Sequence, residues 1–445
     1  MNLFSKILAL FLLSLMGAGC AFAPRYETLE ANLRSGHYPD AVKELASGEK
    51  RYGEKARLLY YFDRLWAEHL AGNYAQSNEY AEKANTLIDQ LYTKSLSDEA
   101  LSFLGNDMNQ AYEGESFERV MLHVVSMLNY AELGDTDAAL VEARRADERL
   151  AQYVEKAGKD KVVYQQDALA RFISGALYES QGGQQLQDAY LDYKKADEAF
   201  GIYMKAYGTA RPHLLDRELL KMSTGLGEGE DQSAFEGRFG KTEFVPLKVL
   251  QKEKGEVIVL LYEGLAPVKV SESITLPIHL DDGTAQYFQA AFPRFQSRQT
   301  SFANAVLNDE SGAKEPLELF QDISSIAIQD LKDRVGLITL KAIARATAKF
   351  QAARAIQKKA KESGNEAAQV FAFLGTNLYS LISEQADTRS WRTLPSRISI
   401  ARMALDPGTH TLRLAISQGS MQSSHEFSNV KIEAGKKVFL IHSIY

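Results

Sequence analysis

Gly134-Asp-Thr-Asp-Ala-Ala139, followed by Ala143 and Ala146, is one copy of a pattern that recurs in the first half of the chain. Each copy has a glycine and, about five positions later, a small residue. Small or apolar residues follow four and seven positions after that one, on the same helical face. The other copies begin at Gly36, Gly72 and, more loosely, Gly183, and place Ala41, Ser77 and Ala189 at the small position. A glycine that ends one helix, followed by small residues on the next, lets two helices pack closely. The pattern therefore predicts an array of helical hairpins.

This pattern resembles the tetratricopeptide repeat, which builds curved arrays whose concave face usually holds an extended peptide or a partner helix. The small positions are 36, 62 and 50 residues apart, and only the first spacing is near the repeat's period of roughly 34 residues. We therefore expect an irregular array, and generic helical hairpins remain the alternative. The apolar periodicity predicts helices over residues 26–35, 38–51, 55–71, 74–92, 97–109, 116–133, 136–155, 162–181 and 188–207.

The composition changes after the array. Residues 223–242 are rich in Gly, Glu, Asp and Ser, which is typical of a linker. Beyond them the apolar residues alternate as in strands. The predicted fold is a tetratricopeptide-like helical array over 20–222, followed by an α+β domain over 243–445 with a helical insert over 316–385 and β-sandwich-like strands at its C-terminal end.

The elements of the predicted α+β domain follow from the same patterns. Residues 406–414 indicate a turn followed by a strand, as in the hairpins of small β-sandwich modules. Helices are predicted over 316–332, 335–361 and 365–384. Strands are predicted over 256–262, 267–280, 286–292, 397–405, 408–417, 424–432 and 437–443.

The N-terminus has the order of a signal peptide. Residues 1–19 hold a charged start, an apolar stretch too short to span a bilayer, and small residues before Cys20, the single cysteine. This segment resembles the bacterial lipoprotein signal, in which the cysteine is acylated and becomes the first residue of the mature chain. Ala21, in place of Asp, implies release to the outer membrane, facing the periplasm. An ordinary secretory signal with an incidental cysteine is the alternative.

Composition and motifs argue against several kinds of function. The net charge of −7 disfavours a generic nucleic-acid binder. The eight histidines lack zinc-binding spacing, and no Gly-x-Ser-x-Gly nucleophile motif occurs. We therefore expect no cofactor, no metal and no enzymatic activity.

One dense group of charged residues has two interpretations. Glu113, Glu115 and Glu118 precede Glu142, Arg144 and Arg145 by one predicted helical hairpin. Catalytic carboxylates need a cleft that shifts their pKa values apart, whereas adjacent arginines favour salt bridges that lock a repeat. The alternative is a polar patch on the concave face that recognises a partner.

The predicted helical insert is basic. From Arg334 to Lys361 there are eight basic and no acidic residues, and Lys341, Arg345 and Lys349 lie on one stripe. Such a helix is either a solvated or salt-bridged face, or a surface that contacts anionic lipid or another acidic surface. Trp391, beside Arg389 and Arg392, is interpreted as a structural residue before a strand, with a cation–π ligand groove as the alternative.

Several segments together resemble a family of poorly characterised Gram-negative lipoproteins with tetratricopeptide-like repeats, often encoded beside a penicillin-binding-protein activator lipoprotein. The segments are residues 107–118, 128–135, 139–145, 263–269 and 386–395. The resemblance implies an envelope location, an acylated Cys20 and protein partners. We expect a periplasmic docking scaffold in envelope or peptidoglycan assembly. The alternative is an envelope protein that binds or cleaves glycan through its C-terminal domain.

Overall fold

The computed structural model describes residues 26–97, 108, 110–158, 162–279, 285–298, 302–362, 364 and 386–445. The predicted signal segment, Cys20, the predicted helix over 365–384 and most of that over 97–109 lie outside these residues. The chain is about 57% helical, with 12 helices in the described part and a sheet-containing region that follows most of them. Within that part, no helix has both the length and the apolar character needed to cross a membrane.

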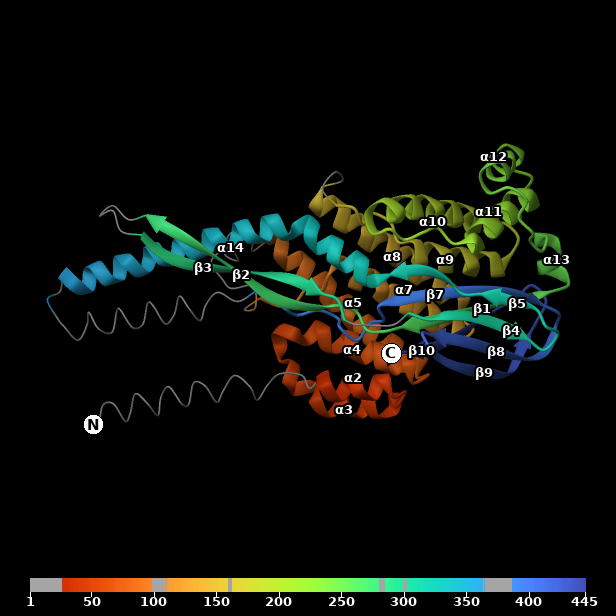
Figure 1. Ribbon diagram of the computed structural model, residues 1–445, viewed down its shortest axis with the longest axis horizontal. Helices are drawn as coiled ribbons and strands as arrows, with labels where there is room; N and C mark the ends of the chain where they lie inside the picture. The colour runs from red at the N-terminus through yellow and green to blue at the C-terminus, as the bar shows by residue number, and fades with distance from the viewer. Residues whose placement is uncertain are drawn as a thin grey trace.

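The first half consists of antiparallel helical hairpins, stacked side by side (Figure 1). The helices are α2 (Tyr26–Arg34), α3 (Tyr38–Tyr52), α4 (Arg57–Leu70), α5 (Tyr74–Ser97), α7 (Ser116–Glu132), α8 (Thr136–Ala157), α9 (Ala168–Gln181), α10 (Gln185–Tyr207), α11 (His213–Leu226) and α12 (Gly229–Phe239), with a short 3₁₀ turn at Glu54–Ala56. The hairpins α4–α5, α7–α8 and α9–α10 make the most extensive contacts.

The glycine and small-residue pattern is the basis of this stacking. The four pattern glycines have positive φ angles between 57° and 76°, which glycine adopts without strain. The four small residues that follow them, Ala41, Ser77, Ala139 and Ala189, are completely buried where the helices of a hairpin approach. The prediction of closely packed hairpins is confirmed.

The segment 223–242 is not a linker, contrary to the sequence interpretation. It contains the end of α11 and all of α12, joined through Gly227 in the left-handed conformation. Phe235 and Phe239 lie four residues apart and stack with their ring centroids 5.5 Å apart. Tyr190 of α10 donates a hydrogen bond to Asp231 at 2.6 Å. The apolar spacing and these contacts outweigh the Gly- and Glu-rich composition.

The second half contributes two four-stranded sheets and a two-stranded hairpin. The first sheet has the strand order β10-β1-β7-β6, the second sheet has the order β5-β4-β8-β9, and β2 pairs with β3. The strands are β1 (Gly255–Glu263), β2 (Val268–His279), β3 (Ala285–Gln296), β4 (Asn304–Asp309), β5 (Lys314–Pro316), β6 (Glu318–Asp322), β7 (Arg397–Leu405), β8 (Gly408–Gln418), β9 (Met421–Ile432) and β10 (Lys437–Ile444); a short helix α13 (Leu247–Lys252) precedes them.

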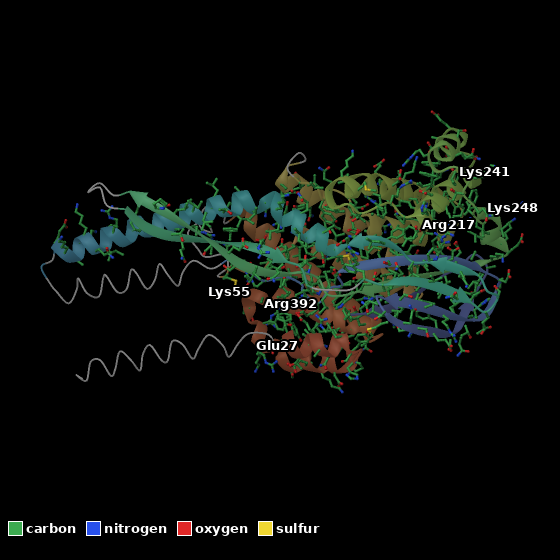
Figure 2. All side chains as sticks on the ribbon, in the orientation of Figure 1. Glu27, Lys55, Arg217, Lys241, Lys248 and Arg392 are labelled. Atoms are coloured by element: carbon green, nitrogen blue, oxygen red, sulfur yellow. The ribbon has the colours of Figure 1, made fainter. Side chains whose placement is uncertain are left out.

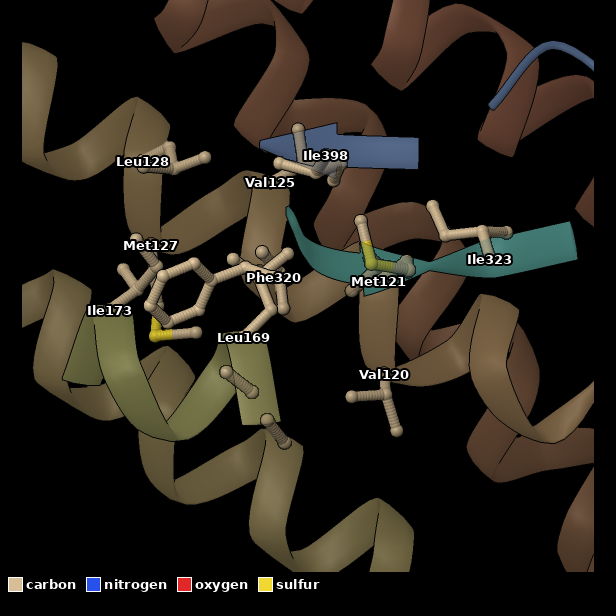
Figure 3. Close-up of a cluster of buried hydrophobic side chains, with 14 of the residues drawn as sticks. Val120, Met121, Val125, Met127, Leu128, Leu169, Ile173, Phe320, Ile323 and Ile398 are labelled. Atoms are coloured by element: carbon tan, nitrogen blue, oxygen red, sulfur yellow. The ribbon is translucent and has the colours of Figure 1, made fainter. Parts of the chain in front are cut away.

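The first sheet is the middle of three layers. Strand β1 is buried along its whole length, because alternate residues face opposite layers. Ile258, Leu260 and Tyr262 pack into the helical core, and Val257 and Leu261 pack against the second sheet. Figure 3 shows Phe320 of β6 and Ile398 of β7 among side chains of α7 and α9. The predicted domain 243–445 therefore shares one core with the helices that precede it.

The turn at Asp406 does not form a hairpin between its flanking strands. Strand β7 belongs to the first sheet, whereas β8 belongs to the second. The chain thus crosses from one sheet to the other at this turn, and the two sheets bury a common apolar layer. The prediction of sandwich-like C-terminal strands agrees with this packing, but the predicted local pairing is wrong.

A long helix and the β2–β3 hairpin form an arm that projects from the body (Figure 1). Helix α14 (Ile323–Glu362) lies against β3 and replaces the two helices predicted over 316–332 and 335–361. Its 40 residues span about 60 Å. The insert starts at Ile323 and not at 316, because residues 318–322 form β6 and pair with β7.

Candidate functional site

Residues 386–396, here called the strap, follow the arm and cross the helical array before the chain enters β7. Trp391 is its buried anchor. The indole stacks on Phe62 of α4, with ring centroids 4.5 Å apart and 14° between the planes, and lies edge-on to Trp66. The prediction that Trp391 has a structural role before a strand agrees with this position.

Two buried carboxylates of the array hold the strap. The backbone N–H of Trp391 donates to Glu118 of α7 at 2.6 Å. The hydroxyl of Thr393 donates to Asp63 of α4 at 2.7 Å. At the rim, Arg392 donates to Glu30 of α2 at 2.7 Å.

The arginines of the strap contact tyrosines of the array. The guanidinium of Arg392 lies 4.6 Å from the ring centroid of Tyr26, and that of Arg389 lies 5.4 Å from Tyr112. Arg389 also donates to the carbonyl oxygen of Lys55 at 2.8 Å. The chain's own strap, together with the first sheet, therefore covers the inner side of the array, where a docked partner was expected.

The buried carboxylates under the strap have raised pKa values. Burial and the neighbouring charge of Glu115 raise the pKa of Glu118 to about 7. The Glu118 side chain accepts hydrogen bonds from the hydroxyl of Tyr112 at 2.5 Å and from the backbone N–H of Glu115 at 2.9 Å. Burial raises the pKa of Asp63 to about 6, against the opposing effect of hydrogen bonds from Tyr52, Thr393 and Tyr26.

This shift at Glu118 predicts a pH dependence of stability. The folded state keeps the proton up to about pH 7, whereas the unfolded chain releases it near its ordinary pKa of 4.5. The contribution of Glu118 to stability is therefore complete below the unfolded pKa and is lost as the pH rises through the folded one. Relative to Glu118→Gln, the wild type should lose up to about 3 kcal/mol between about pH 4.5 and pH 8.

Urea denaturation of both proteins across this range measures that difference, and the histidine and carboxylate contributions that the two proteins share cancel in it. Glu113→Gln is the matched control, since Glu113 lies in the same segment but is only half-buried. A free-energy difference between wild type and Glu118→Gln that stays constant with pH would contradict the prediction.

Glu115 ties the base of the arm to the array. It caps the start of α7 in a reciprocal arrangement with Glu118. Its carboxylate also forms ion pairs with Lys269 of β2 and Arg334 of α14. Burial alone would raise the pKa of Glu115, but these two cations hold it well below its usual range. Both components of the arm therefore meet one carboxylate of the array.

We expect Glu115→Gln to loosen the arm at its base. The substitution removes the charge that compensates Lys269 and Arg334, and should cost about 1–3 kcal/mol. Amide hydrogen exchange should accelerate in β2 and in the first turns of α14, and remain unchanged in the first sheet. Glu142→Gln, which alters a carboxylate that does not touch the arm, should leave exchange in the arm unchanged. Equal acceleration in both variants would contradict this assignment.

The other predicted charged residues lie elsewhere in the array. Glu142 of α8 accepts a hydrogen bond from His123 at 2.7 Å and pairs with Arg145 at 2.9 Å. Arg145 also reaches Glu82 of α5 at 2.8 Å. Arg144 is exposed. The six residues therefore do not form one patch: Glu115 and Glu118 hold the arm and the strap, and Glu142 and Arg145 link neighbouring hairpins.

A larger polar cluster was not predicted from the sequence, because its members are scattered along the chain. Six charged side chains, each at most 6% exposed, meet between the helices and the first sheet. They are Glu179 of α9, Glu218 and Lys221 of α11, Glu256 of β1, Arg402 of β7 and Lys437 of β10. The three carboxylates balance the three cations.

Arg402 is the centre of this cluster. It contacts Glu256 at 2.5 Å, Glu179 at 2.7 Å and Glu218 at 2.8 Å. It also donates to the hydroxyl of Tyr193 at 2.8 Å. Although burial would lower the pKa of Arg402, the three carboxylates raise it well above its ordinary value. The cluster fixes α9 and α11 on the sheet.

The exposed surface of the arm differs from the predicted basic stripe. Lys341 is exposed, but Arg345 is only 5% exposed and lies on the face that also buries Ala342 and Ala346. The side chain of Lys349 lies outside the described residues. The stripe is therefore not one continuous basic surface. On the outer side of α14, Leu337 and Leu340 are 60% and 62% exposed.

In the described part of the chain, no group of three or more His, Cys, Asp or Glu side chains is placed to hold a metal ion. No protein-family model matches the chain, and a search of curated proteins finds none that is similar to it.

Proposed function

We propose that the protein is a periplasm-facing lipoprotein, held at the outer membrane by an acylated Cys20, that acts as a non-catalytic scaffold for protein partners in cell-envelope or peptidoglycan assembly. The helical hairpins are interpreted as tetratricopeptide-like repeats. The proposal differs from the sequence expectation in one respect: the docking surface is on the arm.

The observation that carries this proposal is the contrast between a covered array and a projecting arm. The inner side of the array is covered by the strap and the first sheet, with Trp391 fully enclosed. The arm extends beyond the body (Figure 1), and its helix α14 exposes Leu337 and Leu340. Two neighbouring exposed leucines on one face of a projecting helix supply the kind of apolar anchors that a groove of another protein takes up.

Site-specific photocrosslinking in cells tests the docking surface. A crosslinker at Leu340 should capture one defined envelope protein. The control position is Leu133, which is 50% exposed at the end of α7 in the array. The same products from both positions, or none from Leu340, would exclude docking through the arm.

The anchor is tested separately. Wild-type protein should stay in the outer-membrane fraction through a high-salt wash, which removes electrostatic contacts, whereas Cys20→Ser should not be acylated and should leave that fraction in the wash. Wild-type protein found in the soluble fraction would exclude the lipoprotein assignment. It would not affect the crosslinking test, which does not depend on the anchor.

A further inference from the structure

The outer end of the arm is basic on its exposed surface. Arg354, Lys358, Lys359 and Lys361 are all exposed in the last turns of α14. Between them, Ile356 is 53% exposed. Long cationic side chains around an exposed apolar one resemble the composition of helices that lie at a bilayer surface.

Among the described residues, the positive charge at this end is only partly balanced by neighbouring acidic residues. The sequence has eight basic and no acidic residues from Arg334 to Lys361. The described hairpin contributes one acidic residue, Glu272, which pairs with Arg294 of the same hairpin. Glu362, the last residue of α14, adds one exposed carboxylate beside Arg354, Lys358, Lys359 and Lys361, and Asp281, Asp282 and Glu366 fall outside the described residues. The arm is therefore a cationic extension of a chain with a net charge of −7.

We propose that the end of the arm binds the surface of an anionic bilayer, with its lysines on lipid phosphates and Ile356 at the headgroup boundary. A second copy of the chain would bring like charges together, which disfavours self-association through this face. An anionic bilayer supplies many phosphates and tolerates the side-chain positions that the exposed face of a helix presents. This contact is independent of Cys20 and adds a second attachment to the membrane.

The test uses the mature chain from residue 20 with Cys20→Ser, so that no acyl chain contributes. Sedimentation with vesicles of phosphatidylcholine, with and without phosphatidylglycerol, measures partitioning. Binding should require phosphatidylglycerol and weaken at high salt. Each cation near such a surface is worth about fivefold, so the triple variant Lys358→Gln, Lys359→Gln, Lys361→Gln should bind about 100-fold more weakly. Ile356→Ser should weaken binding without changing its salt dependence.

A matched variant removes the same charge from the other end of the molecule. Lys241 and Lys248 lie there, far from the arm (Figure 2). Lys241→Gln, Lys248→Gln, Lys252→Gln should bind vesicles like the wild type. Equal weakening in both triple variants would show a general charge effect and overturn the proposal. Failure of the parent chain to bind anionic vesicles would also overturn it. A third contrary result is that the arm variant still binds vesicles but no longer forms a crosslink from the arm to an acidic protein or to a second copy of the chain.

Discussion

Replacing Arg402 by methionine is expected to lower the free energy of unfolding by about 3–5 kcal/mol. The substitution leaves three carboxylates facing Lys221 and Lys437 in a site that is almost completely buried. Neither water nor another cation can reach the uncompensated charge without opening the layer between the helices and the first sheet. Urea denaturation at neutral pH measures the loss.

Two further variants separate charge balance from packing. Adding Glu256→Gln to Arg402→Met restores the balance, so the double variant should be more stable than the single one. Arg413→Met removes an arginine from the neighbouring sheet, where the side chain is 65% exposed, and should change stability by less than about 0.5 kcal/mol. If Arg402→Met unfolds at the same urea concentration as the wild type, the cluster does not stabilise the layer.

Trp391→Ala is expected to cost about 3–5 kcal/mol, because it removes the largest buried side chain of the strap and leaves a cavity against Phe62. The strap should then detach from the array. Arg389 and Arg392, which have partners in the array, would become accessible to trypsin. Thermal unfolding measures the first effect, and limited proteolysis at these two arginines measures the second.

Trp391→Phe is the matched control for this prediction. The indole N–H finds no acceptor among the described residues, so phenylalanine forfeits no hydrogen bond and keeps part of the stacking. Its cost should be less than half that of alanine. Rapid cleavage at Arg389 in the wild type, or similar losses for both variants, would mean that the indole does not hold the strap.

Local patterns were sufficient to predict many elements of this fold. The strand β7 has the predicted bounds, and most helices from α2 to α10 begin and end within a few residues of prediction, because periodicity and glycine positions act over one or two turns. The helices α11 and α12 were not predicted. One exception is α9, which begins at Ala168 and not at 162. Asp167 caps it there by accepting a hydrogen bond from the N–H of Ala170 at 2.7 Å.

Long-range arrangements could not be predicted in the same way. The sequence around Asp406 indicates a turn but not that its two strands join different sheets. Glu118 stands out in a dense acidic segment, yet its partner Trp391 is 273 residues away. The sequence indicated a structural role for Trp391, but it did not indicate that the indole would pack on Phe62 of the array. The Gly- and Glu-rich composition of residues 223–242 wrongly indicated a linker, because the stacked Phe235 and Phe239 belong to a helix there.

The position of β10 has a consequence for how the protein is made. This strand pairs in parallel with β1, and the paired residues Val257 and Val438 are about 180 positions apart. At about 5–20 residues per second, synthesis of that interval takes about 10–40 s. Throughout this time the apolar side of the helices has no completed sheet to cover it. The sheet that covers the array is therefore completed only after the last strand of the chain has been made.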